Sequence, residues 1–172
     1  DDDIVLVLCG DVPLIRAESL QPLIEAARAG AAVLTMVVDD PQGYGRIVRD
    51  GSGQLLRIVE ERDANELERR IDEINTGLIA ARADHLRRWL GALTADNAQG
   101  EYYLTDIVAM AVAENVPVAA VKTGNPDEVR GINDREQLAQ AERLVCRRRA
   151  RNLMRHGVTV ADPARLDVRG SV

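Results

Sequence analysis

The chain has 172 residues, a hydrophobic share of 46% and a formal net charge of −6, which fits one globular domain or one with a small appendage. Aromatic residues make up 2% and Phe is absent, so few side chains can stack on bases; with the acidic balance, this argues against a nucleic-acid partner. The two cysteines are far apart in the sequence, which argues against a zinc site and a disulfide framework. With two histidines, a catalytic nucleophile activated by His is not favoured either. No apolar run reaches the ~20 residues that span a bilayer.

The first apolar run, residues 4–8, predicts a short strand buried on both faces, as in a parallel sheet. It stops at Gly10 and Asp11, at the edge where open α/β folds bind ligands. Gly10 would let a ligand approach the backbone, and the Asp11 carboxylate suits Mg²⁺. The plainer alternative is that Asp11 opens a turn or caps the next helix. Three aspartates precede the run without an initiator Met, so we expect the middle of a longer protein.

Helical spacing predicts a helix over 17–27, and an apolar run predicts a strand over 31–38; the strand-helix-strand order implies a parallel sheet. A hairpin is expected from strands 46–49 and 54–59, with Gly45 at its entry and Glu60 at its exit, close in space. The further expected elements are a charged helix over 63–74, strands over 74–80, 116–121 and 129–134, a helix over 84–93 capped by Asp84, a helix after Asp106, a helix of about twenty residues from Arg135 that stops at Gly157, and an extended segment over 158–172.

Six motifs occur in one order along the chain. They are Gly10-Asp11-Val12-Pro13-Leu14, Gly43-Tyr44-Gly45-Arg46-Ile47, Ile58-Val59-Glu60-Glu61, Glu73-Ile74-Asn75-Thr76-Gly77, Asn97-Ala98-Gln99-Gly100-Glu101-Tyr102-Tyr103-Leu104-Thr105-Asp106 and Gly131-Ile132-Asn133-Asp134-Arg135. Together they resemble the family of bacterial bifunctional N-acetylglucosamine-1-phosphate uridyltransferase/glucosamine-1-phosphate acetyltransferases, over essentially the whole chain. The ordered set is far more specific than any single motif.

The resemblance implies an α/β fold in three parts. Residues 1–134 would form the later half of a Rossmann-like sugar-nucleotidyltransferase domain, residues 135–156 a helical arm, and residues 157–172 the first coil of a left-handed parallel β-helix. The family's Gly-rich nucleotide loop would lie upstream and its acetyltransferase site downstream. We therefore expect the isolated chain to be inactive, with base specificity and the acetyltransferase residues outside it.

The reaction implied is transfer of uridylyl from UTP to N-acetylglucosamine-1-phosphate, giving UDP-N-acetylglucosamine and pyrophosphate. The sugar phosphate is already anionic, so positioning and charge neutralisation are sufficient for in-line attack. By resemblance, Asp11 and Asn133 hold Mg²⁺. The other residues implied are Gly45, Glu60 and Asn75 around the sugar, Cys9 and Gly10 on the nucleotide side, and Tyr103 and Thr105 toward sugar or phosphate. The family often has Tyr at the position of Cys9, so only a backbone contact is expected there.

The family also implies a cytoplasmic homotrimer that supplies precursors for cell-wall peptidoglycan and lipopolysaccharide. Alternatives remain open for the chain, namely another sugar-1-phosphate nucleotidyltransferase or a non-catalytic sugar-nucleotide-binding or assembly module. Taken singly, Glu60 fits a surface ion pair and Asn75 a turn or cap residue. The arginine cluster is expected to be a solvated helix face in preference to a nucleic-acid or membrane patch, or else to contact acidic surface of a neighbouring subunit. It consists of Arg147, Arg148, Arg149, Arg151 and Arg155.

Overall fold

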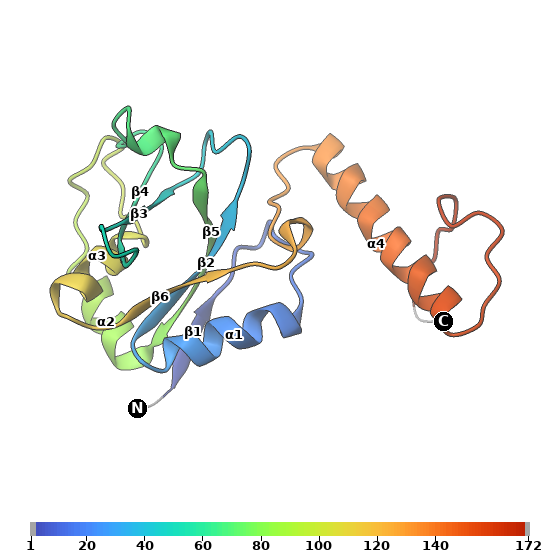
Figure 1. Cartoon of the computed structure of the whole chain (residues 1–172), viewed down its shortest axis with the longest axis horizontal. Helices are drawn as coiled ribbons and strands as arrows, with labels where there is room; N and C mark the ends of the chain where they lie inside the picture. Colours follow the sequence, from blue (N-terminus) through green and yellow to red (C-terminus); the bar gives the residue numbers. More distant parts are fainter. Residues whose placement is uncertain (1–2, 171–172) are drawn as a thin grey trace. The chain divides into compact units, whose positions relative to one another are not determined.

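The computed structural model describes residues 3–170, which form two compact units. Within the described residues, unit 1 comprises residues 3–9 and 16–126, and unit 2 comprises residues 10–15 and 127–170. The elements, labelled in Figure 1, are β1 (Ile4–Val7), α1 (Ala17–Ala27), β2 (Ala31–Val37), β3 (Arg46–Arg49), β4 (Leu55–Val59), β5 (Glu73–Arg82), α2 (Ala83–Leu90), α3 (Asp106–Ala113), β6 (Val118–Lys122) and α4 (Arg135–Arg155), with 3-10 helices at Glu68–Arg70 and Pro126–Glu128.

The sheet of unit 1 is mixed, with the order β4-β3-β5-β2-β6 and β1 also paired to β5. The long β5 runs antiparallel to β1, β2 and β3, while β2 and β6 are parallel. The prediction of a parallel sheet from the first strand, helix and second strand was wrong. The strands β1 and β2 point the same way, but they do not pair with each other, because β5 lies between them and runs antiparallel to both. Val5 in β1 is 37% exposed, so this strand is not buried on both faces either. An apolar run does not reveal the direction of its partner.

Helices cover both faces of this sheet. Alternate residues of β2 and β5, such as Val33 and Ile79, join α2 and α3 in one buried cluster that includes Trp89 and Ile107. The helix α1 buries Leu23 against β2, β5 and β6 on the other face. In Figure 1, α2 and α3 lie beside one another and α1 runs along the sheet separately from them. The α/β architecture expected from the sequence is confirmed.

Several predicted elements differ from the structure. The charged stretch 63–74 holds one short 3-10 helix, and β5 begins at Glu73. Residues 129–134 form no strand. Asp84 is not a cap, because Arg82 occupies the N-cap position of α2 and the Asp84 carboxylate accepts hydrogen bonds from Arg82 and from the backbone of His85. In these stretches, polar and charged residues are compatible with a helix, a strand end or a turn. The residue pattern therefore did not predict the correct secondary structure there.

Unit 2 is built on α4, which begins at Arg135 and ends before Gly157, as expected. The Asp134 carboxylate accepts the backbone N–H of Gln137 at the N-terminus. At the other end Gly157 has φ +89°, and the backbone N–H of Val158 donates to Leu153 O, as in a Schellman motif. Residues 158–170 contain turns and no strand. The predicted β-helix coil stays a prediction, as do the domain bounds 1–134, 135–156 and 157–172, and residues 171–172 lie outside the described part.

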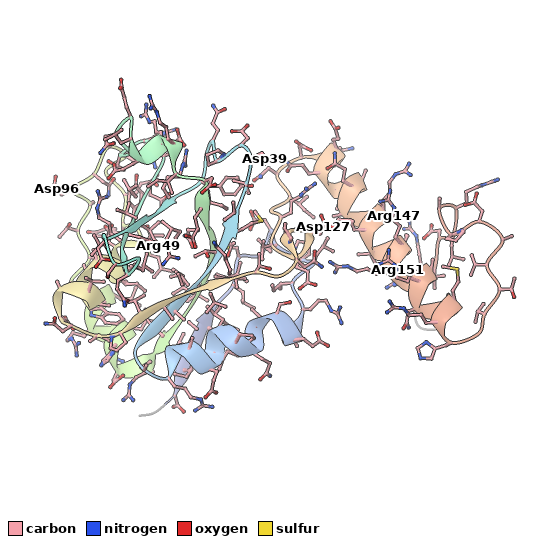
Figure 2. All side chains as sticks on the ribbon, in the orientation of Figure 1. Asp39, Arg49, Asp96, Asp127, Arg147 and Arg151 are labelled. Atoms are coloured by element: carbon pink, nitrogen blue, oxygen red, sulfur yellow. The ribbon has the colours of Figure 1, made fainter. Side chains whose placement is uncertain are left out.

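The arginine cluster largely forms a solvated face of α4, and Figure 2 labels Arg147 and Arg151 on this helix. Arg148 and Arg149 have partners: the Arg148 guanidinium donates to Leu14 O and lies 3.7 Å from a Glu128 carboxylate oxygen, and the Arg149 guanidinium donates to Val168 O. Within residues 3–170, no helix is long and apolar enough to cross a bilayer.

Candidate functional site

The β3–β4 hairpin brings Gly45 and Glu60 together in unit 1. The strands pair from Arg46 with Val59, so the residues just outside the ladder face one another. A Cβ added at Gly45 would lie 2.9 Å from Ile58 Cγ2 and 3.2 and 3.3 Å from the two carboxylate oxygens of Glu60. Only a residue without a side chain fits this approach. The expected proximity of hairpin entry and exit is therefore present.

Two further predicted residues join this pair. The Thr105 hydroxyl donates to Glu60 Oε1 at 2.8 Å, so the partner of this carboxylate is a hydroxyl group and not the surface cation of the alternative reading. The backbone N–H of Asn75 donates to Gly45 O at 2.8 Å. Thr105 and Asn75 are buried, being 8% and 9% exposed. We call Gly45, Glu60, Asn75 and Thr105 the sugar cluster.

Asn75 fits both readings that its sequence context allowed. Its Oδ1 accepts the backbone N–H of Gly77 at 3.1 Å, which is a local turn-type hydrogen bond. The amide nitrogen can still donate to a ligand. Gly77 has φ +82°, and a Cβ there would lie 2.8 Å from Cys9 Sγ, which donates to Gly77 O at 3.5 Å. Cys9 thus packs on β5, the strand that carries Asn75 of the sugar cluster.

Tyr103 lies on the connection between α2 and α3, close to acidic groups. Its hydroxyl accepts a hydrogen bond from Gln99 Nε2 at 2.7 Å. Burial raises the pKa of Tyr103, the Gln99 hydrogen bond opposes this, and the charges of Asp63 and Glu60 raise it further. The pKa of Asp106 is also raised, first by burial and then by the charge of Asp63. The phenol therefore stays protonated near neutral pH and can donate to a sugar or phosphate oxygen.

Sequence reasoning did not single out Arg46 and Glu61, which brace the entry of the hairpin. Arg46 is 1% exposed, and its guanidinium donates to Tyr44 O and to Glu61 Oε2. Glu61 Oε2 also accepts the backbone N–H of Gly43 at 3.2 Å. The hydrogen bond from Arg46 is the main cause that lowers the pKa of Glu61. The sequence signal that could have revealed this ion pair is the presence of an arginine and a glutamate at the two ends of a predicted hairpin.

Asp11 and Asn133 come together in unit 2, although 120 or more residues separate them in the chain. The backbone N–H of Ile132 donates to Asp11 O at 2.9 Å. A Cβ at Gly131 would lie 3.4 Å from Asp11 Oδ2 and 3.9 Å from Asn133 Nδ2, so the missing side chain leaves open space between these two groups. The expectation that both residues end strands was wrong: Asp11 follows β1 by four residues, and Asn133 immediately precedes the N-cap of α4. Asp11 does not cap α1 either, because Arg16 occupies that position.

The Asp11–Asn133 pair fits a hard cation. A carboxylate and an amide oxygen are suitable ligands for Mg²⁺, and this ion usually takes its remaining ligands from water and phosphates. Over residues 3–170, there is no group of three or more His, Cys, Asp or Glu side chains that could hold a metal by itself. Any Mg²⁺ at this pair would therefore depend on ligands brought by a substrate. Gly10, expected on the nucleotide side, is exposed and has open space at its Cβ position.

Comparisons with known proteins support the family expected from the motifs. The chain is 56% identical over 173 residues to "Bifunctional protein GlmU" of Methylococcus capsulatus and 54% identical over 172 residues to that of Bordetella parapertussis, covering 100% of this chain in both cases. It spans 38% of the length of each of these relatives. No protein-family model matches the chain.

A crystal structure from Bacillus anthracis, assigned as a glucose-1-phosphate thymidylyltransferase in complex with sucrose, is similar in fold. Its TM-score is 0.56 at 19% identity, and the match covers 95% of this chain and 58% of that chain. This likeness supports the sugar-nucleotidyltransferase fold. Over the stretch of those proteins that it spans, this chain is homologous to the bifunctional GlmU family, which confirms the resemblance that the motifs predicted.

Proposed function

We propose that this chain carries the sugar-phosphate side of a Mg²⁺-dependent N-acetylglucosamine-1-phosphate uridylyltransferase. The reaction would consume UTP and N-acetylglucosamine-1-phosphate and release UDP-N-acetylglucosamine and pyrophosphate. The observation that supports it best is the sugar cluster, in which four residues from separate motifs meet in one unit. Homology to bifunctional GlmU proteins supports the same reaction.

The sugar cluster offers the mixed polarity that a hydroxyl-rich ligand needs. Glu60 accepts one hydrogen bond from Thr105, and an ionised carboxylate has about four acceptor sites, so sugar hydroxyls can donate to the remaining ones. The Asn75 amide nitrogen can donate to a carbonyl or hydroxyl oxygen. Gly45 gives a ligand close access to backbone atoms. Because these groups are already held by hydrogen bonds, little side-chain entropy is lost on binding.

In this proposal Tyr103 donates its phenolic proton to a sugar or phosphate oxygen. Positioning the acceptor phosphate is the main contribution of these residues, because an anionic phosphate oxygen needs no general base. Asp11 and Asn133 would hold Mg²⁺, which supplies charge neutralisation to the phosphates when bound. Cys9 and Gly10 would face the nucleotide through their backbone.

The proposal for the longer protein goes further. At the full length of its GlmU relatives, it would also acetylate glucosamine-1-phosphate from acetyl-CoA, assemble as a homotrimer, and act in the cytoplasm to supply cell-wall and lipopolysaccharide precursors. This chain alone would be inactive, because the nucleotide loop expected upstream is needed to hold UTP.

The test is pyrophosphate release from UTP, with and without Mg²⁺, for this chain and for a protein extended to the full length of the relatives. N-acetylglucosamine-1-phosphate and glucose-1-phosphate are offered in parallel. We expect Mg²⁺-dependent turnover of the acetylated sugar by the extended protein and none by this chain. Preference for glucose-1-phosphate would indicate a different sugar-1-phosphate nucleotidyltransferase. Absence of turnover with every substrate would favour a binding or assembly module.

A further inference from the structure

The loop over residues 97–103, in the connection between α2 and α3, has a defined anchor in unit 1. We propose that Asp63 is a positioning residue for sugar-phosphate recognition, because it ties this loop to the turn that carries Glu60 and thereby holds Tyr103 at the sugar cluster. This inference rests on the proposed function. It assigns a role to a residue that none of the six motifs contains.

Asp63 is fixed relative to Glu60 by the backbone. The N–H groups of Asp63 and Ala64 both donate to Glu60 O at 3.0 Å. Ala64 is 5% exposed, so the turn is also held by packing. Residues 60–64 therefore form one short rigid turn, with the sugar-cluster carboxylate at one end and the Asp63 carboxylate at the other.

Asp63 reaches the 97–103 loop through a hydrogen bond from the backbone of Ala98. Its Oδ1 accepts the backbone N–H of Ala98 at 2.8 Å. The loop is braced internally, because Asn97 Oδ1 accepts the backbone N–H groups of Gln99 at 3.1 Å and Glu101 at 3.2 Å. A displacement of Ala98 would therefore move Gln99 with it.

Gln99 carries this restraint to Tyr103. Its Nε2 donates to the Tyr103 hydroxyl at 2.7 Å, and Asp63 is near enough to Tyr103 to raise the pKa of the phenol. Two segments distant in sequence are thus joined at two points: Asp63 to Ala98, and Glu60 to Thr105 at 2.8 Å. The hydrogen bond between Thr105 and Glu60 lies inside the sugar cluster. The hydrogen bond between Ala98 and Asp63 positions the loop that carries Tyr103.

Kinetics of the full-length extended protein test this role. Asp63→Ala should raise KM for N-acetylglucosamine-1-phosphate about fivefold, the factor for one hydrogen bond of about 1 kcal/mol, and leave KM for UTP unchanged. Asp63→Asn keeps an oxygen that can accept from Ala98 and should restore the wild-type KM. The matched control is Asp96→Ala, which removes an exposed carboxylate just before the loop (Figure 2) and should change neither constant.

Amide hydrogen exchange in this chain checks the anchor without any need for activity. Exchange at Ala98 should become about fivefold faster in Asp63→Ala and stay unchanged in Asp63→Asn and Asp96→Ala. Equal exchange in Asp63→Ala and wild type would overturn the inference, as would a wild-type KM for the sugar phosphate. An Asp63→Asn protein as impaired as Asp63→Ala would contradict the hydrogen-bond role. Loss of the proposed function would be recognised separately, by a wild-type protein that releases no pyrophosphate.

Discussion

In unit 1 the members of the sugar cluster are buried or half-buried and are joined in pairs by hydrogen bonds, whereas in unit 2 Asp11 and Asn133 are exposed around open space. The sugar cluster has its partners before any ligand arrives, as Thr105 and Glu60 show. The unit 2 pair offers one carboxylate and one amide, too few ligands to hold an ion by themselves. In the proposed function, this difference would correspond to a preformed site for the sugar and a cation site that substrate phosphates complete.

Asp11→Ala should have the largest effect. In the extended protein we expect pyrophosphate release to fall by roughly 100-fold or more, since the variant removes a charged ligand from the proposed cation site. The melting temperature should change little, because Asp11 is exposed. Asp39→Ala removes another exposed carboxylate, labelled in Figure 2, and serves as the control. Wild-type turnover by Asp11→Ala would refute the metal assignment.

Gly45→Ala tests the preformed sugar cluster. The new Cβ would lie within 3.3 Å of Ile58 and both Glu60 oxygens, so the carboxylate must move. We expect about 1–3 kcal/mol lower stability and a KM for the sugar phosphate raised about 10-fold. Denaturant unfolding and initial rates measure the two effects. Gly51→Ala is the control, because a Cβ at Gly51 would have no atom within 4 Å. An equal loss of stability in Gly51→Ala and Gly45→Ala would show that any glycine substitution has this effect.

Unit 1 also contains a buried glutamate, Glu73, with hydrogen-bond partners outside the sugar cluster. We expect its substitution to change the stability of the protein and not the binding of substrate. Glu73 accepts hydrogen bonds from Thr35 at 2.7 Å and from Arg49, which Figure 2 labels. Burial raises the pKa of Glu73, but the hydrogen bonds from Arg49 and Thr35 outweigh it and lower the pKa below the ordinary 4.5. A folded-state pKa below the unfolded one stabilises the protein above about pH 4.5, and this contribution is lost as pH falls through the folded value.

Thermal unfolding between pH 7 and pH 3 measures this contribution. Glu73→Gln should lower stability at pH 7 by about 1–3 kcal/mol and show a weaker loss on acidification than wild type. Glu66→Gln changes an exposed residue and should follow the wild-type curve. A Glu73→Gln protein with an unaltered pH dependence would remove Glu73 from the acid response.

The smallest effect is expected on the exposed face of α4. Arg147→Ala and Arg151→Ala should change stability by less than about 0.5 kcal/mol and leave uridylyl transfer unchanged, as for solvated side chains. Sedimentation of the extended protein checks their other open role, because dissociation of an oligomer by either variant would place this face at a subunit contact. Arg148→Ala provides the contrast, since Arg148 bonds Leu14 O within unit 2.

The sequence by itself determined the elements whose signals are local. Residues 17–27 form a helix from their apolar spacing, the hairpin follows from its turn residues, and α4 begins at Arg135 and ends before Gly157, as the sequence predicts. The approach of Gly45 to Glu60 was also predictable, because the register of a two-stranded hairpin fixes which residues flank it. The ordered motifs were sufficient to identify the family.

Only the tertiary structure decided the long-range pairings. The insertion of β5 between β1 and β2 depends on strand order, for which an apolar run carries no signal. The hydrogen bonds from Thr105 to Glu60 and from Ala98 to Asp63 join segments 45 and 35 residues apart, and the meeting of Asp11 with Gly131 spans most of the chain. Such contacts form because packing of the whole sheet and its loops brings them together. Residue spacing records local geometry alone, so it identified the candidate residues without giving their partners.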